Sequence, residues 1–146
     1  MKRGPSCGPR FDLRVAGDLA VVRRVREELR TFCKRRGVAS KTVDDLLLAV
    51  TEACDNALEH GGAKGVRVLA AVRADRILVR VIGGSRKKLD SLQRGIDASH
   101  RLPPDDWERG RGLFLVRSCV DRVGVGTCGE EIEIRMTKRR RPAAPG

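Results

Sequence analysis

The sequence predicts a single α/β domain, a two-layer sandwich in which helices cover one face of a mixed, mostly antiparallel sheet. The chain has 146 residues, which is enough to bury one hydrophobic core. Segments that alternate apolar and polar residues stand before and after segments with helical spacing, in the order strand, two helices, two strands, long connection, helix, two strands. Because strands that pair in sequence leave the helices on one side, this order favours two layers.

The folded domain is expected to span residues 10–138. Residues 1–9 are rich in Gly, Pro and Ser, which is typical of a disordered N-terminal tail. Residues 139–146 form a short basic C-terminal tail in this interpretation.

The N-terminal half is predicted to contain one strand and two helices. Arg10–Ala16 alternates apolar and polar residues, as a half-buried strand does. Asp18 is a favourable N-cap for a helix that continues to about Arg36. Apolar residues recur at helical spacing along Thr42–His60, and Thr42 with Asp45 three residues later predicts a capping box at its start.

A hairpin and a lid are expected next. Gly65–Ala71 and Arg76–Ile82 alternate on either side of a tight turn and predict two antiparallel strands. Between Gly83 and Arg109 the periodicity disappears, apart from one short helix near Ser91–Ile96. A connection of this length in a compact domain is usually functional or disordered, and we interpret it as a mobile lid.

The remaining residues predict a helix and a second hairpin. Leu113–Asp121 follows a glycine pair and has apolar residues at helical spacing. Arg122–Thr127 and Glu131–Met136 alternate and complete the sheet.

Composition and charge limit the function classes. The net charge is +12, and aromatic residues make up only 3% of the chain. Few aromatics disfavour single-stranded nucleic-acid binding, which needs stacking platforms, so any nucleic-acid association is expected to involve the basic tails alone. No apolar run is long enough to span a membrane, and the expected location is the cytoplasm. The cations assigned to the tails are Lys2, Arg3, Arg10, Lys138, Arg139, Arg140 and Arg141.

The five cysteines are an odd number and show no CxxC spacing. We interpret them as small buried hydrophobic residues in a reducing compartment, in preference to a metal site or a disulfide framework.

Glu52 and Asn56 are the first candidate site residues. They are four residues apart on the predicted helix Thr42–His60, so their side chains lie on one side of it. A carboxylate and an amide placed in this way can hold a water and a cation. A solvated helix face is the alternative interpretation, because such pairs are common on exposed faces.

Two motifs favour the functional interpretation. The string from Glu52 to His60, followed by Gly61 and Gly62, resembles the N-box of the ATPase superfamily that includes histidine kinases, gyrase and mismatch-repair ATPases. The sequence GRGLFLV at residues 110–116 resembles the second glycine box of that superfamily. A glycine-rich turn before a helix directs backbone N–H groups toward an anion. With a lid-length gap between them, the two motifs most resemble those of the anti-sigma-factor serine kinases.

This resemblance implies a function and a set of site residues. Glu52 would act as general base toward a serine hydroxyl of a partner protein, and Asn56 would ligate Mg²⁺. The residues implied to bind ATP are Asn56, Gly83, Gly110, Arg111, Gly112, Leu113 and Phe114. The protein would hold a sigma factor inactive, phosphorylate an anti-anti-sigma protein on serine, and form a homodimer.

Three positions depart from the family pattern. Val81 stands where the family has the aspartate that accepts a hydrogen bond from the adenine amino group, and Ser85 replaces a glycine of the first glycine box. Glu130 replaces a threonine that helps to read the base. The sequence therefore leaves two functions open, namely an ATP-dependent serine kinase and a non-catalytic module of the same fold that captures a protein partner.

Overall fold

The computed structural model describes residues 10–16, 20–59, 65–98 and 111–140. Its elements follow the predicted order. They are β1 (Phe11–Val15), α1 (Ala20–Arg35), α2 (Ser40–Glu59), β2 (Val66–Val72), β3 (Arg76–Gly83), the 3₁₀ helix η2 (Arg86–Lys88), α3 (Leu89–Ala98), α4 (Arg111–Cys119), β4 (Arg122–Cys128) and β5 (Glu131–Arg139).

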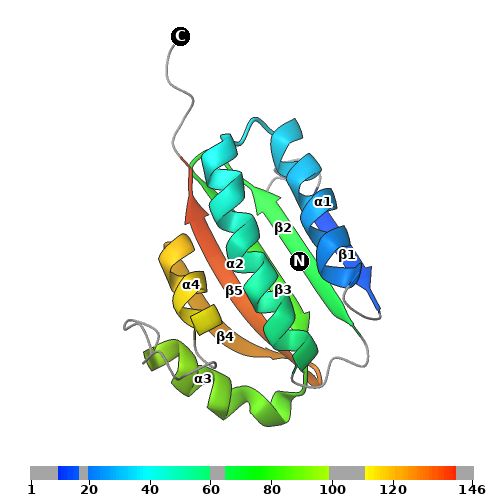
Figure 1. The fold of residues 1–146 in the computed structure, drawn as a ribbon, viewed down its shortest axis with the longest axis vertical. Coiled ribbons are helices and arrows are strands. Elements are labelled where there is room, and N and C mark those ends of the chain that lie inside the picture. Colours follow the sequence, from blue (N-terminus) through cyan, green and yellow to red (C-terminus); the bar gives the residue numbers. More distant parts are fainter. Residues whose placement is uncertain (1–9, 17–19, 60–64, 99–110, 141–146) are drawn as a thin grey trace, which may run out of the picture.

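The five strands form one sheet in the order β1-β2-β3-β5-β4. All four pairings between these strands are antiparallel, so the sheet is not mixed as predicted. Figure 1 shows α1, α2 and α4 lying across one face of the sheet, with α2 in the middle. The predicted two-layer α/β sandwich is therefore confirmed.

The core lies between α2 and the sheet. Alternate residues of β2, β3 and β5 are buried under the helices, namely Val66, Val68, Ala70, Ile77, Val79, Val81, Ile132, Ile134 and Met136. Eight residues of α2 are buried against them, and all are aliphatic, alanine or cysteine. Because aromatics are scarce, the core consists mainly of branched aliphatic side chains, with alanine and cysteine between them. In the described part of the chain, no helix is both long and apolar enough to cross a membrane.

The predicted capping box is wrong. Helix α2 begins at Ser40, and the N–H of Val43 already donates to the carbonyl of Ala39 at 3.0 Å. Thr42 therefore lies inside the first turn and cannot be the N-cap. The Asp45 carboxylate accepts instead from the ammonium groups of Lys41 at 3.1 Å and Lys138 at 3.4 Å.

The predicted lid contains more structure than expected. Gly83 is the last residue of β3, so the connection starts one residue later. Helix α3 has ten residues, and its Leu92 and Ile96 side chains are buried in the core. Residues 99–110, the remainder of the predicted lid, lie outside the described residues.

The C-terminal boundary also differs from the prediction. Strand β5 runs through Arg139, so Lys138 and Arg139 belong to the sheet and not to a tail. The next residue, Arg140, holds three elements together. Its guanidinium donates to the carbonyls of Arg36 at 3.3 Å and Gly37 at 3.2 Å, beyond the end of α1, and to that of Arg73 at 3.1 Å in the β2–β3 turn.

Three cysteines are buried as predicted, Cys33, Cys54 and Cys119. Burial raises the pKa of the Cys33 thiol to about 11 and that of the Cys54 thiol to about 12, so both stay protonated at neutral pH. Cys128 is exposed at the end of β4, which corrects the prediction for that residue, and Cys7 lies outside the described residues.

Replacing Arg140 with Ala is expected to lower the free energy of unfolding by about 2 kcal/mol, because three carbonyls lose a charged donor. Urea denaturation of the two proteins measures this difference. Arg139→Ala removes the same charge from an exposed position of β5 and is the matched control, expected to cost less than about 0.5 kcal/mol. Equal losses in the two variants would contradict the role assigned to Arg140.

Candidate functional site

Helix α2 places Glu52 and Asn56 at the border between the core and the surface. The small buried side chains Ala49, Ala53 and Ala57 face inward on neighbouring turns and fix the rotation of the helix. Glu52 and Asn56 are consequently half-buried, neither solvated nor enclosed. Glu52 lies beside the first turn of α4, and Asn56 lines a small cavity together with Gly83 of β3 and Leu92 of α3.

The structure brings the two sequence motifs together at Glu52. A Cβ atom added to Gly112, in the first turn of α4, would lie 2.8 Å from Oε2 of Glu52. A side chain at position 112 would displace the Glu52 carboxylate, whereas glycine leaves room for it. Two residues 60 positions apart in the sequence therefore lie side by side in the structure.

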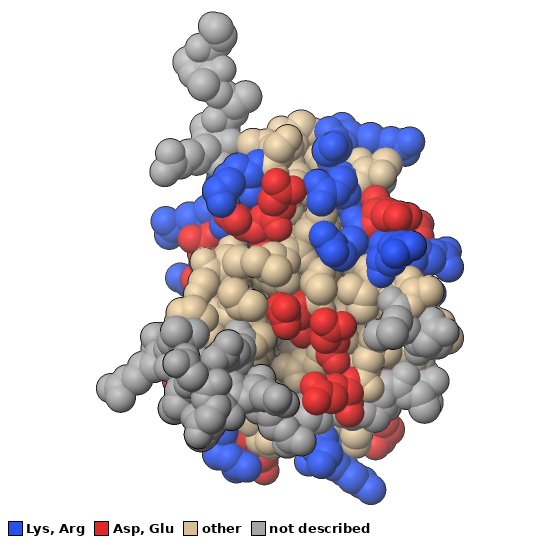
Figure 2. All heavy atoms as spheres, in the orientation of Figure 1, with Lys and Arg blue, Asp and Glu red and all other residues tan. Residues whose placement is uncertain are grey.

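Negative charge accumulates along this edge of α2. Glu52, Asp55 and Glu59 follow one another at helical spacing, and Figure 2 shows acidic side chains across the middle of the helix face beside a hollow. Within the described ranges, no Lys or Arg forms an ion pair with any of the three. Burial, and then the charge of Asp55, raises the pKa of Glu52. Burial, and then Glu59, raises the pKa of Asp55.

A divalent cation fits this site only with help from a ligand. Among the described residues, no three His, Cys, Asp or Glu side chains are grouped closely enough to hold a metal ion alone. Mg²⁺ is usually bound by one or two protein oxygens together with phosphate and water. The amide oxygen of Asn56 and the carboxylate of Glu52, which pairs with no Lys or Arg among the described residues, suit that arrangement. The first turn of α4 lies beside Glu52, and backbone N–H groups at a helix N-terminus favour phosphate oxygens.

The remaining residues of the second glycine box differ in what their side chains contact. Helix α4 begins at Arg111. Leu113 packs toward α3, since a Cβ added to Gly95 would lie 2.6 Å from its Cδ1 atom. Phe114 is half-buried, and its carbonyl accepts from the Ser118 hydroxyl at 2.8 Å. Gly110 lies outside the described residues, as do His60, Gly61 and Gly62 of the N-box.

The side of the site where the resemblance places adenine is filled by hydrophobic packing. Val81 is only 1% exposed and belongs to the core. It borders a cavity of about 10 Å³, which is room for about one water. The other lining residues are Asn56, Ala57, Gly83, Gly84, Leu92, Ile132 and Ile134. In this lining only the Asn56 side chain is polar, so the described residues do not fit an adenine.

The other two departures from the family pattern also have structural roles. The Ser85 hydroxyl accepts from the N–H of Lys87 at 3.3 Å and caps η2. The Glu130 carbonyl accepts from the N–H of Arg86 at 3.0 Å and holds η2 against the β4–β5 turn. Both residues thus fix the start of the predicted lid.

Comparison with known proteins identifies the family. The profile of the histidine kinase-like ATPase domain matches residues 15–138. The chain belongs to this family. It is 30% identical to the serine-protein kinase RsbW of Bacillus pumilus over 78% of this chain and 75% of that protein. It is 26% identical to the anti-sigma F factor of Clostridium acetobutylicum, over 75% and 78% of the two chains. Within the family it belongs with the anti-sigma-factor serine kinases.

Two solved structures share the fold. The RsbU and RsbW domains of a Mycobacterium tuberculosis protein match with a TM-score of 0.66 and 20% identity, over 93% of this chain. The chain spans only 34% of that longer protein. The SiaB–SiaC complex from Pseudomonas aeruginosa matches with a TM-score of 0.64 and 13% identity, covering 88% of this chain and 89% of the other.

Membership implies ATP and magnesium as ligands of the family in general. The geometry of this chain fits the metal and phosphate side but not the base side. Sequence analysis also missed three residues of the site, Asp55, Glu59 and Leu92. The spacing of the two acids from Glu52 was visible in the sequence, whereas the approach of Leu92 depends on how α3 packs.

Replacing Glu52 with Gln is expected to raise the free energy of unfolding at pH 7, by less than about 1 kcal/mol because solvent screens the half-buried charge. The folded state raises the pKa of Glu52, so its ionised form opposes folding above that pKa. The advantage of the variant should therefore disappear as the pH falls to 4.5, the ordinary value, and below.

Urea denaturation between pH 7 and pH 4 measures this dependence. Glu27→Gln, which removes an exposed carboxylate from α1, is the control. A Glu52→Gln variant less stable than the wild type at pH 7 would contradict the electrostatic account of the site.

Proposed function

We propose that the chain is an anti-sigma-type regulator of transcription that acts in the cytoplasm by capturing a protein partner. The partner would be a sigma factor, and an anti-anti-sigma protein would release it. Two findings support this proposal. The chain belongs with the anti-sigma-factor serine kinases, and it is similar to an anti-sigma F factor. The observation that carries the choice of capture over chemistry is the packed base side of the site around Val81.

Capture needs a stable surface, and α2 supplies one. Its buried face is anchored in the core, while Leu48, 42% exposed, lies one turn from Glu52 on the outer face. An exposed leucine beside half-buried acids can contribute to a protein interface, where apolar contacts are surrounded by polar groups. The proposal does not require nucleotide to hold this surface in place.

A serine kinase is the second candidate function, and Glu52 favours it. Its carboxylate is half-buried, has a raised pKa and lies beside the N-terminal turn of α4. A raised pKa moves a carboxylate closer to the range in which a general base is effective at neutral pH. Transfer of labelled phosphate from ATP to a serine of an anti-anti-sigma protein, lost in Glu52→Gln, would support this candidate over simple capture.

Capture is tested with purified alternative sigma factors and the housekeeping sigma factor in size-exclusion chromatography and in vitro transcription. We expect a stoichiometric complex with an alternative sigma factor, and inhibition of its transcription, in the absence of nucleotide. An anti-anti-sigma protein should reverse the inhibition. Binding to none of these sigma factors, or binding that strictly requires ATP, would contradict the proposal.

Nucleotide selectivity is tested by calorimetric titration with ATP, GTP and tripolyphosphate, each with magnesium. Because Asn56 has the only polar side chain among the described residues that line the cavity at Val81, the affinities for the three ligands should differ by less than about threefold, or all be too weak to measure. Asn56→Ala should weaken any binding of the three ligands equally. ATP bound at least about tenfold more tightly than GTP would overturn this account of the base side.

A further inference from the structure

The face of the sheet opposite the helices is strongly basic. Register places seven arginines and three carboxylates on it. The arginines are Arg14, Arg67, Arg76, Arg80, Arg122, Arg135 and Arg139, and the acids are Asp12, Glu131 and Glu133. Figure 1 shows α1, α2 and α4 on the other face. This basic surface is made by the sheet itself and not by the predicted tails.

Three of these arginines are neutralised by cross-strand ion pairs. Arg67 holds Asp12 with two hydrogen bonds of 2.9 and 2.7 Å. Arg80 pairs with Glu133, which is only 8% exposed. Arg14 reaches from β1 to Glu131 on β5 at 3.2 Å, across the two strands between them. The acids of this face are all used in these pairs.

The other four arginines form what we call the arginine face, Arg76, Arg122, Arg135 and Arg139 on β3, β4 and β5. Within the described ranges, Arg122, Arg135 and Arg139 form no ion pair, and Arg76 has only its exposed neighbour Asp75 at 3.9 Å. Arg76 and Arg139 are directly opposite each other in the β3–β5 register. Like charges in such a pair repel each other, so the pair lowers the stability of the folded protein unless a bound anion neutralises it.

Glycines on β4 shape this surface. A Cβ added to Gly124 or Gly126 would lie 3.8 Å from Nη2 of Arg135. The guanidinium of Arg135 therefore extends across β4, over two residues that have no side chains. Arg122 lies opposite Thr137 on the same face, next to the Arg76–Arg139 pair.

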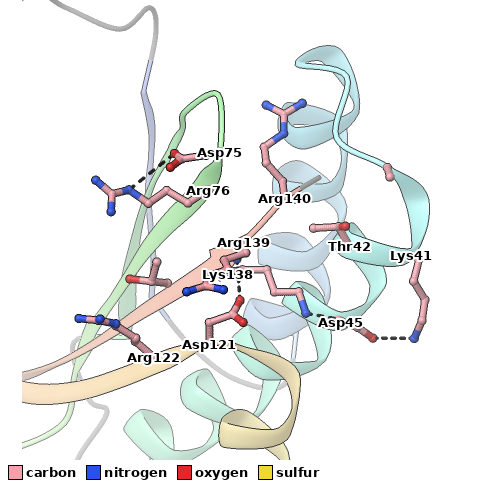
Figure 3. Close-up of a pocket in the computed structure, with 12 residues that line it drawn as sticks. Lys41, Thr42, Asp45, Asp75, Arg76, Asp121, Arg122, Lys138, Arg139 and Arg140 are labelled. Atoms are coloured by element: carbon pink, nitrogen blue, oxygen red, sulfur yellow. Dashed lines mark hydrogen bonds and ion pairs between the residues drawn. The ribbon is translucent and has the colours of Figure 1, made fainter. Parts of the chain in front are cut away.

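A broad groove adjoins the arginine face at the end of the sheet. Its volume is about 1310 Å³, and cations outnumber acids in its walls. The cations are Lys41, Arg76, Arg122, Lys138, Arg139 and Arg140, and the acids are Asp45, Asp75 and Asp121. Figure 3 shows Arg76 and Arg122 extending from the sheet away from α2, whereas the side chain of Lys138 extends toward it. The groove lies near Thr42, ten residues before Glu52, which is about 15 Å along the axis of α2. It is therefore separate from the Glu52 site.

We infer that the arginine face and this groove bind an acidic segment of a protein partner. Carboxylates of the partner would occupy the positions beside the like-charged Arg76 and Arg139, where bidentate hydrogen bonds are available. Half-buried Leu69, Ala71 and Leu78 on the same face offer apolar contacts between the charges. Such a mixture of arginine and apolar surface is typical of protein interfaces.

Other occupants fit less well. A single-stranded nucleic acid fits less well, because the described strands of this face carry no aromatic side chain on which bases could stack. A second copy of this chain docked face to face would bring arginines against arginines.

The inference is tested with a fluorescent peptide of about 15 residues in which Glu alternates with Leu, and with a matched peptide carrying Gln in place of Glu. The full-length protein is compared with the triple variant Arg76→Gln, Arg122→Gln, Arg139→Gln. The matched control is Arg23→Gln, Arg26→Gln, Lys34→Gln, which removes three exposed cations from α1. A duplex DNA of about 15 base pairs is the competing probe, at low and at physiological salt.

We expect the wild type to bind the Glu peptide in preference to the Gln peptide, and the sheet variant to lose at least about tenfold in affinity. The α1 variant should lose less than about threefold. The sheet variant should melt no lower than the wild type, because it removes the repulsion between Arg76 and Arg139.

Equal weakening by both triple variants would overturn the inference, since charge alone would then explain binding. It would also be overturned by duplex DNA that binds more tightly than the peptide and is lost only in the sheet variant. A dimer of the wild type that the sheet variant abolishes in sedimentation would assign the face to a second copy. None of these outcomes depends on nucleotide or on Glu52, so the capture proposal is tested separately.

Discussion

The burial of one stripe of α2 against the sheet is the constraint on which the rest of the structure depends. Eight residues of this helix lie in the core, and α1 and α4 pack along its two sides. Because the inward face is fixed by packing, the outward edge is fixed as well, and it carries Glu52 and Asn56. The position of the site is thus a consequence of hydrophobic burial, and α4 completes it only because Gly112 has no side chain.

The same burial explains why this chain differs from the pattern of its family at the base side. Val81 faces the core from the middle of the sheet, between Val79 and the strand end at Gly83. An aspartate there would be a carboxylate surrounded by leucine and isoleucine, which is costly unless a partner satisfies it. Valine removes that requirement and lets α3 approach through Leu92. Position 81 of this chain is therefore part of the hydrophobic core, whereas the family pattern has a base-reading aspartate there.

Sequence patterns were sufficient for the order of elements and the two layers, because apolar periodicity and turn residues determine these features locally. These patterns failed where the structure depends on a contact between residues that are far apart in the sequence. Thr42 and Asp45 match a capping box, but Lys138, more than ninety positions away, provides one of the partners of Asp45. Arg140 looked like part of a basic tail, although its hydrogen-bond acceptors are carbonyls near the ends of α1 and β2. Neither contact leaves a local signal.

The two surfaces of the domain also carry charge of opposite sign. On the helix side, Glu52, Asp55 and Glu59 lie along α2 and pair with no Lys or Arg among the described residues, and partial burial raises the pKa of Glu52. On the described strands of the sheet side, Asp12, Glu131 and Glu133 are each paired with an arginine, whereas Arg122, Arg135 and Arg139 form no ion pair. A face that keeps Arg76 opposite Arg139 loses stability that a neutral pair would retain, so its arrangement is explained better by a binding partner than by folding. The high net charge is therefore a property of a defined surface, where it can select among partners, and not only of the chain ends.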